Sequence, residues 1–458
     1  MSGFGAGVPS DEPIGVGVPS AKTSGAALRA DTVDALLREV AEVQSATRQP
    51  SLVVGVVRSG ALVWTSARGR HAGDTAAGPD LQYRIGSLTK TMTAIAVLQC
   101  RDEGLLDLDA PIGSMLSDET PFAATPIRRL LSHSGGLPAE PEGPWWERHD
   151  GSDFDDLAAR VGKQELVLPA GQRFHYSNLA YGLLGELVGR LRGTSWWDVV
   201  RTRLLKPIGM RRTTYSPTTP HAQGYSVHPW SGRLDEEPHT DTGAMAPAGQ
   251  LWSTVEDLAR YAAFWLDPDP AVLAPATAEE MRIPVGGGPD SGLDMAWGLG
   301  LELSGGTTRF GHGGSMPGFL ACLAIDPDER IAAVTLSNGT RGGTPTLAHT
   351  LLDIVAEREP RLSGEWVPEP TIDGADELLG PWYWGNTPFT LVVRDGMLML
   401  DAGRPARSSR LEPVGHDEWR GRDAYFAGES LRVVRREDGT ISHLDLATYT
   451  LTRTPNSP

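Results

Sequence analysis

The chain has 458 residues, of which 40% are hydrophobic and 22% are charged, a composition typical of globular proteins. This length exceeds what one hydrophobic core usually supports, so we expect two domains. The formal net charge of −17 argues against nucleic acid or an anionic membrane as a partner, because either would select a basic surface.

The first elements are predicted from composition and periodicity. Residues 1–30 are rich in Gly, Ser, Pro and Ala and are expected to be a disordered leader. They contain no basic patch followed by an apolar run, so we expect a cytoplasmic protein. An amphipathic helix is predicted at 31–48, followed by strands at 51–58 and 61–67 with a tight turn between them.

Ser87-Leu88-Thr89-Lys90 is the first of three motifs that together indicate a serine acyl-transfer site. Gly86 precedes it and an apolar run with helical spacing follows as far as Gly104, so Ser87 is predicted at a helix N-terminus. This spacing places the hydroxyl and the amine one turn apart on the same face. Free backbone N–H groups and the dipole at that end favour developing negative charge.

Tyr176-Ser177-Asn178 and His312-Gly313-Gly314 are the other two motifs. A serine hydroxyl is a poor nucleophile near neutral pH, so a neighbouring group must take its proton. Lys90 and Tyr176 both remain candidates for that base. Tyr176 can act as a phenolate only if a nearby amine holds its pKa well below about 10. Taken alone, Ser87 is more often a helix cap, and the alternative interpretation of His312 is an ordinary strand histidine with its hydrogen bonds satisfied.

The later part of the chain returns to strands. Residues 87–282 are predicted to be mainly helical. Four strands are then expected, at 296–304, 307–311, 318–326 and 331–337. A helix at 346–357 follows. Early strands pairing with late ones around a helical middle imply a sheet with a large helical insertion.

The domain pattern changes after a linker at 359–372. Residues 373–458 contain short alternating strands with sharp turns, which predict an antiparallel barrel or sandwich. The catalytic motifs all lie in the preceding domain, at 31–358. Within it, the histidines lack the spacing of a metal site, so neither metal nor cofactor is expected.

Four segments in this order resemble the class C β-lactamase and penicillin-binding-protein superfamily: 83–90, 130–137, 174–178 and 311–314. The resemblance covers roughly residues 31–358. It implies an α/β fold in which helices flank an antiparallel sheet beside a helical subdomain. The tail after residue 370 is similar to the lipocalin-like barrels that some members append.

The resemblance assigns a role to each motif. Ser87 would be the nucleophile, with Lys90 and Tyr176 sharing the general-base work. Asn178 would hold Lys90 and contact the substrate amide.

The strand and the oxyanion hole are assigned in the same way. His312, Gly313 and Gly314 would form a strand edge lining the site. The backbone N–H groups of Ser87 and Ser315 would form the oxyanion hole. β-Lactamases and DD-peptidases of the superfamily usually carry Lys-Thr-Gly in the third motif, so these two activities are less expected here.

Two functions share this machinery. The leading hypothesis is a trans-acting thioesterase that accepts a nonribosomal peptide with a D-configured C-terminal residue from a carrier protein and closes it into a ring. The alternative is a cytoplasmic serine hydrolase, such as a family VIII-like carboxylesterase, a D-aminopeptidase or a D-amidase. A catalytically silent binding protein is disfavoured by the full set Ser87, Lys90, Tyr176 and Asn178.

Overall fold

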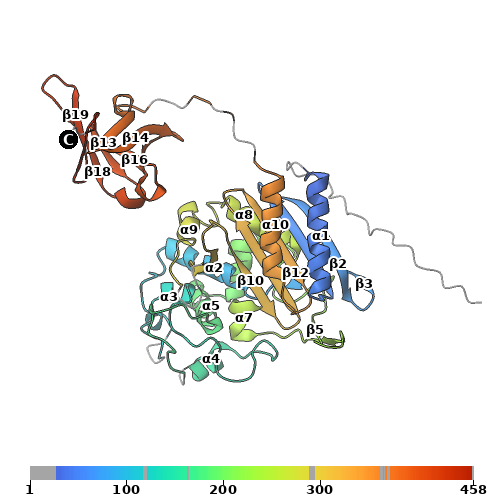
Figure 1. Ribbon diagram of the computed structural model, residues 1–458. Coiled ribbons are helices and arrows are strands. Elements are labelled where there is room, and N and C mark those ends of the chain that lie inside the picture. The colour runs from blue at the N-terminus through green and yellow to red at the C-terminus, as the bar shows by residue number, and fades with distance from the viewer. Residues whose placement is uncertain are drawn as a thin grey trace, which may run out of the picture. The chain divides into compact units, whose positions relative to one another are not determined.

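A computed structural model describes residues 27–116, 121–161, 164–287, 294–361, 365, 367–368 and 372–455. Residues 1–26 of the predicted leader, and much of the predicted linker, lie outside these ranges. The chain divides between Arg361 and Leu362 into two compact units, and each is described by itself (Figure 1). No helix among the described residues is both long and apolar enough to cross a membrane.

The first unit is built on an eight-stranded sheet in the order β3-β2-β1-β12-β11-β10-β9-β8. Its strands are β1 Ser51–Arg58, β2 Ala61–Ala72, β3 Thr75–Ala76, β8 Met295–Trp297, β9 Glu302–Ser304, β10 Phe310–Met316, β11 Phe319–Asp326 and β12 Ile331–Ser337. All neighbouring strands are antiparallel, and Leu52 of β1 lies opposite Ser337 of β12. The predicted fold class is confirmed.

Three of the predicted strands had wrong boundaries, and the first of them, expected at 61–67, continues to Ala72 as β2. The segment expected as one strand at 296–304 is interrupted between β8 and β9, where Gly300 adopts a left-handed φ of 82°. The strand expected to end at residue 311 continues to Met316, because His312 and Gly314 pair with Leu323 and Ala321 of β11. The third motif therefore lies within a strand.

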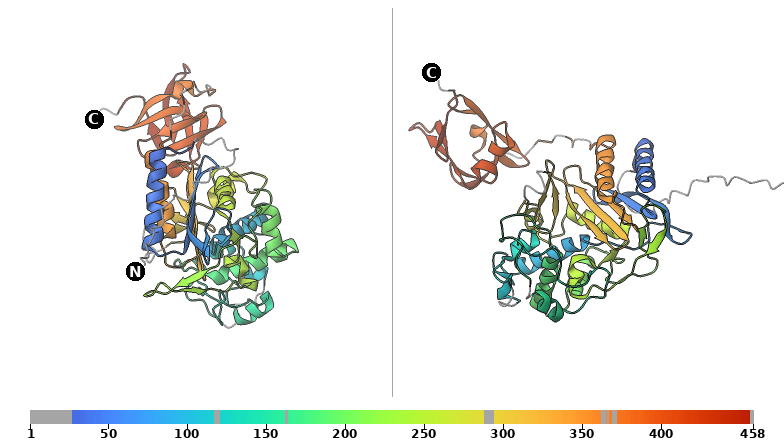
Figure 2. Two further views of the ribbon diagram at one scale, coloured as in Figure 1. Left: turned by 90° about the vertical axis from the view of Figure 1, so that its right-hand side faces the viewer. Right: turned by 60° about the horizontal axis from the view of Figure 1, so that its bottom comes forward.

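Helices cover both faces of this sheet. α1, Ala30–Ala46, and α10, Thr344–Arg358, lie side by side on one face (Figure 1, Figure 2). Successive side chains of β1 point to opposite faces of the sheet and so enter two different hydrophobic cores. Leu52, Val54 and Val56 belong to the core under α1 and α10, whereas Val53 and Val57 join the core shared with the helical region.

The helical region is centred on α2, Leu88–Asp102, whose residues are buried from Leu88 to Cys100. Around it lie α3 Ile127–Leu131, α4 Phe154–Val161, α5 Asn178–Arg192, α6 Trp196–Val200, α7 Ala246–Gly249, α8 Val255–Leu266 and α9 Pro275–Glu280. Two short ladders complete the unit: β4 Tyr83–Arg84 with β7 Trp252–Ser253, and β5 Tyr225–Val227 with β6 Leu234–Glu236. Cys100 and Cys322 are buried thiols.

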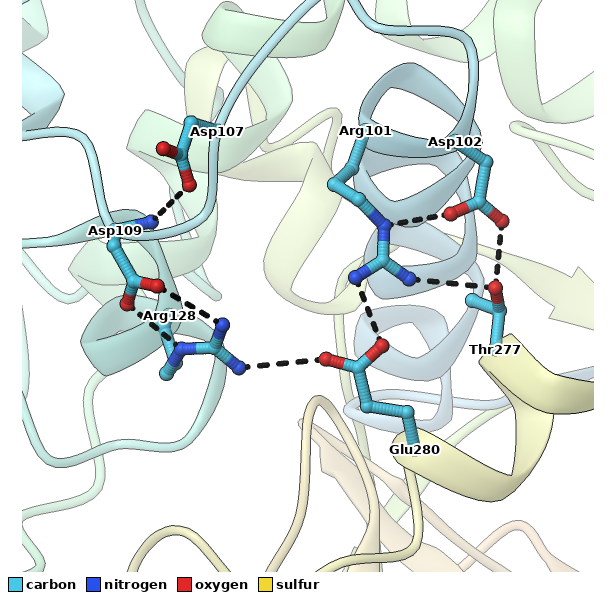
Figure 3. Close-up of polar contacts among 7 residues, drawn as sticks. All are labelled: Arg101, Asp102, Asp107, Asp109, Arg128, Thr277 and Glu280. Atoms are coloured by element: carbon cyan, nitrogen blue, oxygen red, sulfur yellow. Dashed lines mark hydrogen bonds and ion pairs between the residues drawn. The ribbon is translucent and has the colours of Figure 1, made fainter. Parts of the chain in front are cut away.

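An ion-pair network anchors the C-terminal end of α2 (Figure 3). Glu280 of α9 accepts from Arg101 of α2 at 2.8 Å and pairs with Arg128 of α3 at 3.4 Å. Asp102 and Asp109 complete the network, bonding Arg101 and Arg128 respectively. The helix that begins beside Ser87 is therefore fixed at its far end to two other helices.

The second unit is an eight-stranded antiparallel barrel with strands in sequence order. They are β13 Gly380–Trp384, β14 Thr387–Arg394, β15 Met397–Asp401, β16 Ser409–Gly415, β17 Glu418–Gly421, β18 Ser430–Arg435, β19 Ile441–Leu446 and β20 Tyr449–Leu451. Tyr383 and Thr452 exchange backbone hydrogen bonds of 2.7 and 2.9 Å, which nearly close the barrel. Trp382, Leu398 and Leu444 fill its interior.

Candidate active site

Ser87 lies in a tight turn immediately before α2. Gly86 has a φ of 54°, and a Cβ on it would lie 2.6 Å from the backbone nitrogen of Ser315. Glycine is therefore required both by the turn and by the close approach of β10. The Ser87 side chain makes no capping hydrogen bond to α2, so the hydroxyl is not used as a helix cap.

Lys90 is fully buried and directed at Ser87. Its Nζ lies 2.8 Å from Ser87 Oγ and donates to the carbonyl of Ala248 at 2.6 Å. Burial lowers the pKa of Lys90 to about 7, while the charges of Glu140 and Glu147 act in the opposite direction. A substantial fraction of the amine is therefore neutral near pH 7 and able to accept a proton.

Tyr176 completes the group around Ser87. Its hydroxyl hydrogen-bonds Ser87, and Lys90 Nζ lies 5.1 Å from the centre of its ring. Burial raises the pKa of Tyr176 above its ordinary value, and the hydrogen bond with Ser87 only partly opposes this. The phenol is therefore protonated near neutral pH, and the condition for a phenolate base is not met. Of the two candidate bases, the structure favours Lys90.

Asn178, the third residue of the Tyr-x-Asn motif, does not hold Lys90 as expected. Its Nδ2 donates to Glu140 Oε1 at 2.7 Å, while the Lys90 amine bonds Ala248 and Ser87. Asn178 lies at the start of α5, and its backbone N–H donates to the Ala139 carbonyl at 2.7 Å. The amide therefore positions a carboxylate at the site.

The segment His312–Ser315 of β10 runs against the Ser87 turn. β9 pairs with β10 only at Phe310 and Gly311, so the following residues form an edge on that side among the described strands. A Cβ on Gly314 would lie 2.0 Å from the Ile85 carbonyl oxygen and 3.3 Å from the Ser87 nitrogen. This approach brings together the two backbone segments whose N–H groups are the candidate oxyanion hole.

His312 is uncharged in this setting. Burial, assisted by the charge of Lys90, lowers its pKa to about 3, and Nδ1 contacts the Gly313 carbonyl. The third motif therefore supplies no cation where the superfamily's β-lactamases carry lysine.

Several residues around Tyr176 were not singled out as part of the site. His133 stacks on Tyr176 at 4.1 Å between ring centres and accepts from the Ser177 N–H at 3.1 Å. Trp297 packs 5.5 Å from Tyr176 and 5.1 Å from His312. His133 could have been found from the sequence, because it lies in segment 130–137, one of the four that carry the resemblance. Trp297 lies in a strand that contains none of these segments.

Two adjacent glycines provide a matched test of the strand edge. Gly314→Ala is expected to lower kcat/KM by about 100-fold or more, because the new methyl group pushes β10 away from the Ser87 turn and so separates the N–H groups of Ser87 and Ser315. Gly313→Ala meets nothing within 4 Å and is expected to retain activity. Steady-state turnover of an activated ester measures both. Equal activity of the two variants would contradict the proposed position of the oxyanion hole.

Comparison with known proteins assigns both parts of the chain to families. The Beta-lactamase family matches residues 33–357, and a domain of unknown function, DUF7586, matches residues 372–453. Penicillin-binding protein 4 of Amycolatopsis lactamdurans is 31% identical over 63% of this chain and 79% of its own length. Unguisins hydrolase ungD' of Aspergillus campestris is 26% identical over 73% and 68%. Beta-lactamase-like protein 2 of Dictyostelium discoideum is 30% identical over 51%, but the match spans only 46% of that protein.

Solved structures resemble both units. The octameric penicillin-binding protein homologue from Pyrococcus abyssi has a TM-score of 0.65 at 22% identity, and the alignment covers 92% of this chain and 99% of the homologue. At this identity the similarity shows a shared fold. SurE with D-Leu has a TM-score of 0.58 at 25% identity, covering 93% and 100%. With a family match over most of the chain and a serine–lysine pair in contact, this protein belongs to the Beta-lactamase family of serine hydrolases.

Proposed function

We propose that this enzyme forms an acyl-enzyme on Ser87 with a peptidyl group whose reacting residue is D-configured, and transfers that group to the peptide's own amine. It is then a peptide cyclase that accepts a thioester from a carrier protein. The observation that carries the acyl-transfer chemistry is the 2.8 Å separation of Ser87 Oγ and the buried Lys90 amine.

The proposed steps use only these side chains. Lys90 takes the Ser87 proton as Oγ attacks the carbonyl carbon, and the N–H groups of Ser87 and Ser315 stabilise the oxyanion. The bond to the leaving group then breaks, and the proton passes from Lys90 to that group through the Tyr176 hydroxyl. An incoming neutral amine reverses the sequence: it attacks the acyl carbon while Lys90 takes one of its protons, and Lys90 passes that proton to Ser87 Oγ as the bond between Oγ and the acyl carbon breaks.

Support for a D-configured substrate comes from SurE, which aligns with nearly the whole chain and whose structure contains D-Leu. Hydrolysis is the second candidate, because a relative that aligns over 73% of this chain is named a hydrolase of unguisins. Both functions use the same acyl-enzyme and differ only in the acceptor.

Product analysis separates the two candidates. We expect linear peptide thioesters of several lengths, ending in a D-residue, to yield more cyclic than hydrolysed product, because a tethered amine competes with water for the acyl carbon. The matched peptides ending in the L-residue are expected to acylate the enzyme poorly. Mass spectrometry of the products gives the ratio. Hydrolysis alone at every length would rule out the cyclase and leave the hydrolase.

A further inference from the structure

Glu140 is a carboxylate that this fold holds in place beside Asn178. Its Oε1 accepts from Asn178 Nδ2 at 2.7 Å, and its Oε2 accepts from Trp146 Nε1 at 2.6 Å. The residues before it are also fixed, since Ser177 Oγ donates to the Pro138 carbonyl at 2.6 Å. The segment that presents Tyr176 therefore positions Glu140 as well.

The surroundings of this carboxylate connect it to the reacting groups. A Cβ on Gly249 would lie 3.5 Å from the Trp146 ring and 3.8 Å from the Gly86 carbonyl carbon. Gly249 follows Ala248, whose carbonyl accepts from Lys90. Glu140 is also the first of the charges that raise the pKa of Lys90. Indole, carboxylate and amine therefore belong to one wall of the site.

The charge of Glu140 is not neutralised within the fold. Both of its hydrogen bonds come from uncharged donors, and no ion pair to it occurs among the described residues. The side chain is exposed, and a carboxylate has about four acceptor positions, so two remain for a ligand. Glu147 adds a second acidic group near Lys90, and His312 is neutral.

We propose that Glu140 binds a primary ammonium group of the substrate, and that this site selects cationic substrates over those bearing a carboxylate next to the reacting bond. The inference rests on the proposed acyl-transfer function and names its substrate class. A carboxylate–ammonium hydrogen bond is charge-assisted on both sides, whereas a substrate carboxylate would meet a like charge.

The ammonium group has two possible sources. In the acyl donor it is the α-amine of a D-residue, as in an amide or thioester of a free amino acid. In the acceptor it is the N-terminus of the peptide, which binds as the ammonium ion and releases one proton to water before its lone pair attacks the acyl-enzyme. The same carboxylate serves either group, and the two arms of one experiment distinguish them.

The donor arm compares D-leucyl thioester with 4-methylpentanoyl thioester, which has the same skeleton without the amine. If the donor is the source, the wild-type preference for D-leucyl in kcat/KM is expected to fall by about 10- to 100-fold in Glu140→Gln. This variant keeps an oxygen for Asn178 and removes only the charge. Because the preference is a ratio within each variant, any change in the pKa of Lys90 cancels.

The acceptor arm uses N-acetyl-D-leucyl thioester as donor. Glycinamide, largely a cation at the assay pH, competes with water, and hydroxylamine, which is uncharged there, is the reference nucleophile. If the acceptor is the source, Glu140→Gln is expected to lower the glycinamide-to-hydroxylamine product ratio by about tenfold or more. Product ratios are read by mass spectrometry.

Glu142→Gln is the matched control, because this exposed neighbour makes no side-chain hydrogen bond or ion pair among the described residues. It should leave both ratios at the wild-type value. If Glu140→Gln also leaves both unchanged, the ammonium site is wrong. Wild-type enzyme that turns over the 4-methylpentanoyl thioester but forms no acyl-enzyme with any D-residue donor would instead overturn the proposed function, and the acceptor arm with an achiral N-acetylglycyl donor would still decide the role of Glu140.

Discussion

Ser87→Ala is expected to abolish covalent labelling by a fluorophosphonate and to lower turnover of an activated ester by about 10⁴-fold or more. The change removes the only atom that forms the acyl bond, while Lys90 and Tyr176 remain in place. Because the Ser87 hydroxyl makes no cap to α2, thermal stability should stay close to that of the wild type. Intact-protein mass spectrometry measures the labelling.

Ser315→Ala is the matched control for this loss. Ser315 is proposed to act through its backbone N–H, which alanine retains, and its side chain is exposed. Labelling is expected to persist in this variant. If the Ser87→Ala protein is still labelled at the wild-type rate, the nucleophile is another residue. That result would contradict the proposed acyl-enzyme on Ser87.

The serine–lysine contact could be predicted because it depends on local geometry. Ser87 and Lys90 are three residues apart, and any helix that begins after Gly86 brings their side chains to one face. The expected helix ran to Gly104, and α2 ends at Asp102. The β1–β12 pairing was also predictable, since nearly continuous apolar runs early and late in the first unit each required a strand that is covered on both faces.

The partners of Asn178 and Lys90 could not be predicted in the same way. Lys90 donates to the backbone carbonyl of Ala248. Every residue has such a carbonyl, so the sequence does not show which one accepts the bond. Asn178 bonds Glu140, whose position depends on how the loop after His133 folds back onto α5. The protonated state of Tyr176 likewise follows from tertiary burial, which spacing does not report.

Lys90→Met is expected to lower kcat/KM by about 10²- to 10⁴-fold, the usual contribution of a general base. Methionine has a similar length and suits a buried site, so the fold should persist. Lys206→Met removes an exposed lysine and serves as the control. Steady-state kinetics with an uncharged activated ester avoids titration of the substrate.

The pH dependence of the same reaction tests which group is the base. The ammonium form of Lys90 has no lone pair for the Ser87 proton, so the wild-type kcat/KM should rise as the pH passes through about 7, where the buried amine is deprotonated. Tyr176, with its raised pKa, would give an acid limb only at much higher pH. In Lys90→Met the limb near 7 should disappear. If that limb persists unchanged in the variant, the proton is taken by another group, and the burial of Lys90 serves only to orient Ser87.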